Sequence, residues 1–162
     1  LHALFPYTTL FRSNAQGERY SNALEVASAE GHRMVVEVLL SKGADVNAQG
    51  GHYGNALQVA SLGGHDKIVE MLLSKDANVN ALGGHYGNAL QAASARGHDK
   101  IVEVLLSKGA NVNEQGGNYG NALQAASAKG HDKIVEMLLS KGADINAQGE
   151  RYSNALDRKS VV

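Results

Sequence analysis

A short motif returns along this chain at a fixed interval. The pattern Asn-x-x-Gly-x-x-Tyr recurs every 33 residues. A period of this length indicates a small structural unit copied along the chain, and stacked units of this kind bury their apolar faces on one another. The motif begins at Asn14, Asn47, Asn80, Asn113 and Asn146. The units are therefore 14–46, 47–79, 80–112 and 113–145, with the start of a fifth at 146–156.

The third unit predicts two short helices separated by a turn. Asn88 can cap the first helix, because its side-chain oxygen accepts hydrogen bonds from the first N–H groups. Gly97 ends that helix, and Asp99 places a negative charge at the start of the second, where the helix dipole favours it. Gly109 supplies the left-handed residue that closes the second helix. Asp76 stands where the second unit should have this glycine, and we expect the same conformation there at a cost of about 1 kcal/mol.

The second helix of each unit carries one apolar face. In the third unit this face holds Ile101, Val102, Leu105 and Leu106. On the wet side Lys100 is expected to pair with Glu103 at i, i+3. Neither helix is long enough to be stable alone in water, so stacking on neighbouring units must stabilise both. The glycines, asparagines and tyrosine that precede each helix pair are turn residues and predict an extended finger.

These units resemble ankyrin repeats. The resemblance rests on the Gly-His turn, the IVExLL run and the G-A-[DN]-[VI]-N ending, and it covers 14–156. It implies an all-α solenoid of helix-turn-helix units with β-hairpin or loop fingers, four full units plus the start of a fifth. Where the family usually has Thr-Pro-Leu-His, this chain has Asn-Ala-Leu-Gln, as at 88–91. Asn can still cap, while the loss of Pro and His is expected to weaken local rigidity.

Composition changes at both ends of the chain. Both Phe residues, the only Pro and the only Thr residues lie before Asn14. The string LFPYTTLFRS at 4–13 resembles a translated sequencing adapter, and the complementary strand of the same DNA encodes DRKSVV, which stands at 157–162, followed by a stop. We interpret 1–13 as a disordered adapter-derived tail and 157–162 as a second such tail. On this interpretation 14–156 is a fragment of a longer ankyrin-repeat protein.

Composition and motifs argue against several classes of function. The formal net charge of −1 leaves no basic excess for nucleic acid. No apolar run approaches the roughly 20 residues of a membrane helix, and the absence of cysteine excludes disulfides and Cys-ligated zinc. No GxxxxGK[ST] phosphate loop occurs, and the carboxylates and serines recur as features of the repeat. We predict no enzyme activity, no cofactor and no metal.

Two columns of side chains leave alternatives open. The histidines of the Gly-His turns could form a metal ladder, or could bond backbone between the helices. We favour the second interpretation, because metal ligands converge at about 2 Å from one ion. The tyrosines of the motif could form a ledge for a partner or cover the base of each finger, and we favour the structural role. The columns are His32, His65, His98 and His131, and Tyr20, Tyr53, Tyr86, Tyr119 and Tyr152.

The resemblance also implies a binding surface. In stacked ankyrin-like units the fingers and inner helices form a concave face, and we predict that another protein binds there. We expect an intracellular, cytoplasmic protein with no membrane or nucleic-acid partner, whose uncapped ends can self-associate. The candidate contact residues are Gln16, Glu18, Arg19, Gln49, His52, Leu62, Leu82, His85, Arg96, Gln115, Asn118 and Lys129.

A second hypothesis concerns the parent protein. The GGxYGNALQAAS variant resembles fungal ankyrin arrays that often follow an NTP-binding domain in large self/non-self recognition receptors. The chain would then be the sensing or ligand-recognition arm of a signalling NTPase of the NACHT/NLR-like type. A phosphate-loop motif upstream in the full-length sequence would distinguish the two hypotheses.

Overall fold

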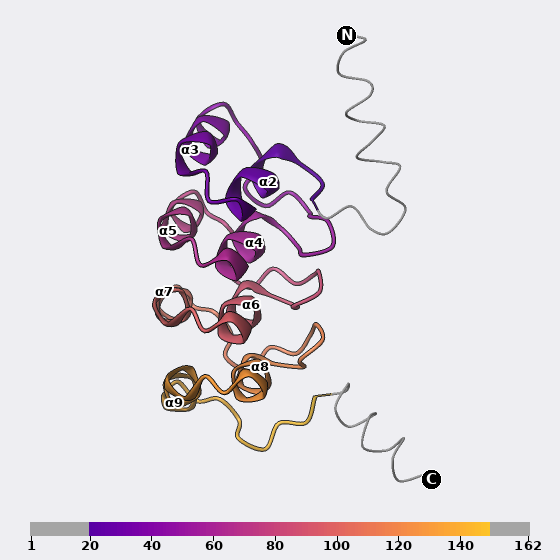
Figure 1. Cartoon of the computed structure of the whole chain (residues 1–162), viewed down its shortest axis with the longest axis vertical. Helices are drawn as coiled ribbons and strands as arrows, with labels where there is room; N and C mark the ends of the chain where they lie inside the picture. Colours follow the sequence, from indigo (N-terminus) through magenta and orange to yellow (C-terminus); the bar gives the residue numbers. More distant parts are fainter. Residues whose placement is uncertain (1–19, 150–162) are drawn as a thin grey trace, which may run out of the picture.

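The computed structural model describes residues 20–149, and over this range the chain is an all-α repeat solenoid. Figure 1 shows two columns of helices, with loops projecting from the side of the inner column. The predicted helix-turn-helix architecture is therefore confirmed. The inner helices are α2 (Ala23–Ala29), α4 (Ala56–Gly63), α6 (Ala89–Arg96) and α8 (Ala122–Lys129). The outer helices are α3 (Arg33–Ser41), α5 (Asp66–Ser74), α7 (Asp99–Ser107) and α9 (Asp132–Ser140).

Several predicted segments lie outside the described residues. These are the two tails, 1–13 and 157–162, and most of the fifth unit, from 150 to 156. Within the described range, no helix combines the length and the apolar character that crossing a membrane requires.

The predicted helix ends are confirmed in the third unit. The side chain of Asn88 accepts a hydrogen bond of 2.8 Å from the backbone N–H of Gln91. Gly97 and Gly109 adopt left-handed conformations with φ of 78° and 89°. Asp76 is the one non-glycine residue between 20 and 149 with positive φ, at 63°. The same asparagine cap occurs at Asn22, Asn55 and Asn121.

The core is a stripe that runs along the array between the two columns. Ile101, Val102 and Leu105 of α7 are no more than 1% exposed, as the apolar face predicts, while Leu106 is half-buried against the same core. Full burial of such a side chain contributes about 1.5–3 kcal/mol. Ala89 and Ala93 on α6 are equally buried, and such small side chains let the inner helices approach one another closely. Since each helix pair packs mainly on its neighbours, stability accumulates along the array.

The charged outer surface differs from the prediction in one detail. Lys100 was expected to pair with Glu103 on its own helix, but its Nζ lies 3.4 Å from Asp66 and 4.0 Å from Glu70 of the preceding unit. Stacking places α5 beside α7, so carboxylates from both helices compete for this lysine. The side chains are 39–55% exposed, and such a pair contributes about 1 kcal/mol at most.

The first Asn of the repeated motif joins the start of its unit to the end of the same unit, and so bridges the loops that follow two successive outer helices. The side chain of Asn80 donates to the carbonyl of Gly109 at 3.1 Å and accepts from the N–H of Asn111 at 2.8 Å. Asn47 bridges Asp76 and Asn78 in the same way, and Asn113 bridges Gly142 and Asp144. This contact with a backbone 29 to 31 residues away explains why the motif recurs with the period of the stack.

The Asn-Ala-Leu-Gln segment ties one unit to the next. Nε2 of Gln58 donates to the carbonyls of Ala81, Gly83 and Gly87 in the following finger, at 3.0–3.2 Å. Its Oε1 accepts from the N–H of Asn55 at 2.6 Å and completes a capping box. The glutamine that replaces the family's histidine thus makes contacts of its own with the next finger, and the effect of this segment on local rigidity stays a prediction.

Candidate binding surface

The fingers stack as a ladder of backbone hydrogen bonds. The N–H of His85 donates to the carbonyl of His52 at 2.9 Å, and the N–H of Asn118 donates to the carbonyl of His85 at 3.0 Å. Within each finger a single antiparallel bridge closes the turn. The tips therefore keep a fixed spacing, and the fingers project side by side from the inner column (Figure 1). The bridges pair Gly51 with Gly54, Gly83 with Gly87, and Gly116 with Gly120.

Three of the predicted contact residues meet at the finger tips. The rings of His52 and His85 have centroids 5.4 Å apart, and the side-chain amide of Asn118 contacts the ring of His85. Each histidine also packs edge-on against the tyrosine that follows it. This row of polar rings and an amide offers both flat surface and hydrogen-bonding groups to a partner.

The Gly-His turns join successive units, which supports the structural interpretation of these histidines. The Nε2 atoms lie 2.9–3.2 Å from carbonyl oxygens of the preceding inner helix: His65 at Ala29, His98 at Leu62 and His131 at Ala95. The bond thus reaches the previous unit, whereas the sequence suggested a bond between the two helices. Among residues 20–149 no three potential ligands gather around a possible metal position.

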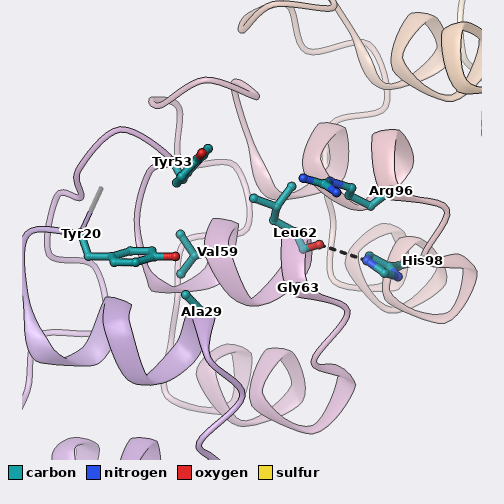
Figure 2. Close-up of a pocket in the computed structure, with 8 residues that line it drawn as sticks. All are labelled: Tyr20, Ala29, Tyr53, Val59, Leu62, Gly63, Arg96 and His98. Carbon is teal, nitrogen blue, oxygen red and sulfur yellow. Dashed lines mark hydrogen bonds between the residues drawn. The ribbon is translucent and has the colours of Figure 1, made fainter. Parts of the chain in front are cut away.

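The tyrosine column borders a groove on the concave face. The rings of Tyr20 and Tyr53 have centroids 6.5 Å apart, and those of Tyr86 and Tyr119 are stacked at 6.2 Å. Beside the first pair lies a groove of about 480 Å³. Figure 2 shows the groove between α2, α4 and the end of α6. Its lining residues are Tyr20, Ala29, Tyr53, Val59, Leu62, Gly63, Arg96 and His98.

The structure brings the other predicted contact residues to two places. Leu62 and Arg96 line the groove, while Gln49, Leu82 and Gln115 are exposed along the fingers. Nζ of Lys129 lies 5.9 Å from the centroid of the Tyr119 ring, within reach of a cation–π interaction. Gln16, Glu18 and Arg19 lie outside the described residues.

Sequence analysis missed part of the groove. Val59, Gly63 and His98 were not among the predicted contacts, yet all three line it. Comparing units 47–79 and 80–112 could have revealed two of them, since Val59 and Gly63 replace Ala92 and Arg96 at the same register. His98 carried no such signal, because every unit has this histidine.

The two ends of the described array expose apolar side chains. Val35 is 48% exposed, whereas Ile68 and Ile101 at the same register are 2% and 1% exposed, because a preceding unit covers them. At the other end Ile145 is 71% exposed and Leu139 36%, beside a second groove of about 210 Å³. These faces are suited to stacking, and self-association through them stays a prediction.

Comparison with known proteins supports the repeat interpretation. A family model described as ankyrin repeats (three copies) matches residues 8–83 and 57–149. A search of curated proteins finds no match to this chain.

Proposed function

The chain belongs to the ankyrin-repeat family, and from that premise we propose that it is a non-catalytic module that binds another protein through its finger tips and concave face. Ankyrin repeats are generally protein-interaction modules. The observation that carries the proposal is the groove of about 480 Å³ at the meeting point of three inner helices and the tyrosine column. Binding sites are commonly concave and combine apolar side chains with a few placed polar groups. In this groove the aliphatic and aromatic side chains stand beside the polar groups of Arg96 and His98.

The rest of the concave face supports the same function. The finger tips are held in register by backbone hydrogen bonds from His85 and Asn118, so a partner meets a surface that is already organised. Preorganisation of this kind lowers the ordering cost of binding. The outer helices, by contrast, present lysines and carboxylates that pair with one another.

Affinity capture with matched variants tests the proposal. The chain serves as bait, beside the double variant His85→Ala, Arg96→Ala on the concave face. The control is Lys133→Ala, Glu136→Ala on α9, where both residues are exposed on the outer side. We expect a specific partner to be retained by the control and lost by the concave variant. A partner that is retained by the concave variant and lost by the control would contradict the proposal.

A second candidate function concerns the surroundings of the array. The GGxYGNALQAAS variant supports the proposal that the array is the recognition arm of a larger signalling NTPase. Sequencing the complete transcript tests this candidate: a GxxxxGK[ST] motif upstream supports it, and a complete reading frame without one counts against it.

A further inference from the structure

The concave face changes character at the second unit. One register position of the inner helices holds Glu30, Gly63, Arg96 and Lys129 in successive units. Gly63 contributes no side chain there, and Leu62 before it stands where the other three units have alanine. The groove opens beside this Leu-Gly pair (Figure 2). It therefore depends on residues that are specific to one unit of an otherwise repetitive chain.

The floor of the groove is apolar and its wall is aromatic. Val59 and Leu62 come from α4 and Ala29 from α2, and the rings of Tyr20 and Tyr53 stand beside them (Figure 2). Tyr20 and Tyr53 offer large flat surfaces that lose little conformational freedom on binding. A bulky aliphatic or aromatic side chain of a partner fits such a surface, because its burial removes apolar area from water on both sides.

The far side of the groove carries positive charge that has no counter-ion within the described part of the chain. Arg96 is exposed, and its side chain makes no hydrogen bond or ion pair with residues 20–149. One unit further, Lys129 lies on the same face and likewise forms no ion pair within the described range. On the outer helices, three lysines do pair with carboxylates: Lys67, Lys100 and Lys133. The concave side thus presents two cations, Arg96 and Lys129, that no carboxylate of residues 20–149 pairs.

We propose that the groove takes an extended acidic peptide segment, in which a bulky apolar residue lies close to one or more Asp or Glu residues. The apolar side chain lies on Leu62 between the tyrosine rings. A carboxylate pairs with Arg96, whose planar guanidinium suits bidentate contact, and further acidic residues extend toward Lys129. This inference rests on the proposed function and adds the chemistry of the partner.

Selection from a phage-displayed library of random peptides on the full chain tests the proposal. The enriched peptides should share a bulky apolar residue with an acidic residue nearby. A labelled copy of the most enriched peptide then serves as the probe in fluorescence anisotropy. Arg96→Gln should weaken its binding by about tenfold, as expected for one lost charge-assisted contact. Arg96→Lys should restore part of the affinity, and Lys133→Gln on the outer side should change it less than about twofold.

The outcomes separate this inference from the proposed function. Enriched peptides without acidic residues, affinity that is unchanged by Arg96→Gln, or no enrichment at all would each overturn the inferred partner chemistry. The proposed function would still stand if affinity capture shows a partner that the concave variant loses. If capture shows no dependence on the concave face, the proposed function fails, and the inference fails with it.

Discussion

At two neighbouring junctions, the inner helix of one unit holds the finger of the next unit through different hydrogen bonds. The earlier junction lies between units 14–46 and 47–79, and the later one between units 47–79 and 80–112. At the later junction the amide of Gln58 donates to three carbonyls of the next finger. At the earlier one Glu25, fully buried, accepts from the N–H of Gly51 at 3.2 Å. It also accepts from the backbone and hydroxyl of Ser21 and from the side chain of Asn22. A donor anchors one finger and an acceptor anchors the other.

The finger changes shape to suit its anchor. Where Gln58 donates, the bridge joins Gly83 to Gly87, and where Glu25 accepts, it joins Gly51 to Gly54, one residue tighter. A carboxylate cannot face the carbonyls that a glutamine faces, so the finger presents an N–H instead. At both junctions a side chain of the inner helix is hydrogen-bonded to the next finger. What differs is the finger turn, whose bridge closes over a different number of residues.

The inner-helix residue that holds the next finger is Gln58 at one junction and Glu25 at the other, and the residue four positions before it differs as well. Gly54 precedes Gln58, and a Cβ added at Gly54 would overlap Oε1 of that glutamine. Ser21 precedes Glu25 and donates to its carboxylate from both its N–H and its hydroxyl. Serine with glutamate and glycine with glutamine are therefore alternative pairs, and mixing them should be unfavourable.

The largest expected effect comes from placing a glutamate, as at position 25, where Gln58 holds the next finger. Gln58→Glu brings a carboxylate against the carbonyls of Ala81, Gly83 and Gly87 at a site that is 3% exposed. An unpaired buried charge should lower the free energy of unfolding by about 3 kcal/mol, measured by urea denaturation. Gln115→Glu, the same change on an exposed finger residue, is the control and should have little effect. A loss below about 1 kcal/mol would mean that this finger can adopt the tighter register as well.

A smaller loss should follow from removing the asparagine bridge that recurs within successive units. Asn80→Ala leaves the carbonyl of Gly109 and the N–H of Asn111 without their side-chain partner. Because water can reach these exposed positions, we expect a cost of about 1.5 kcal/mol, measured as a shift in the urea midpoint. Asn78→Asp is the matched control, since aspartate already fills this position at Asp45 and Asp144. Equal stability of the two variants would show that the asparagine bridge adds nothing to stacking.

Local features of the fold could be predicted from sequence, and contacts across the stack could not. The cap at Asn88 and the left-handed ends at Gly97 and Asp76 follow from neighbouring residues. Gln91 gave no such signal, because its partners, the carbonyls of Glu114 and Gly120, lie 23 and 29 residues away. These bonds exist only after units stack, and a single unit does not reveal which backbone atoms will face the side chain.

The candidate site also has one part that could be predicted from sequence and one part that could not. The concave position of Leu62 and Arg96 could be predicted, because inner-helix register recurs with the repeat. The groove itself could not, since it arises where Gly63 lacks a side chain and where Val59 meets tyrosines from two units. A cavity is set by the side chains around it jointly, whereas the sequence pattern specifies each of them separately.

The proposed coupling of Ser21 with Glu25 predicts a smaller, non-additive effect. Glu25→Gln turns an amide toward the N–H groups of Ser21 and Gly51, and Ser21→Gly removes a hydroxyl that donates to the carboxylate. Each single change should destabilise, while the double variant recreates the Gly-Gln pair of the later units. We expect a coupling energy of about 1 kcal/mol from a double-mutant cycle in urea. Strictly additive effects would show that the two positions act independently.

The smallest expected effect is a gain in stability in the second unit. Asp76 receives the hydrogen bond of Asn47 through its carbonyl and holds φ at 63°, where Gly109 and Gly142 occupy the equivalent positions. Asp76→Gly keeps that carbonyl in place and relieves the left-handed strain, so stability should rise by about 0.5–1 kcal/mol. Calorimetry should show a melting midpoint higher by about 2 °C. Gly109→Asp is the reciprocal change and should lower it by a similar amount, since a Cβ there meets no other atom within 4 Å and only the backbone cost remains. A midpoint that falls in Asp76→Gly would mean that the aspartate side chain stabilises this turn by more than its strain costs.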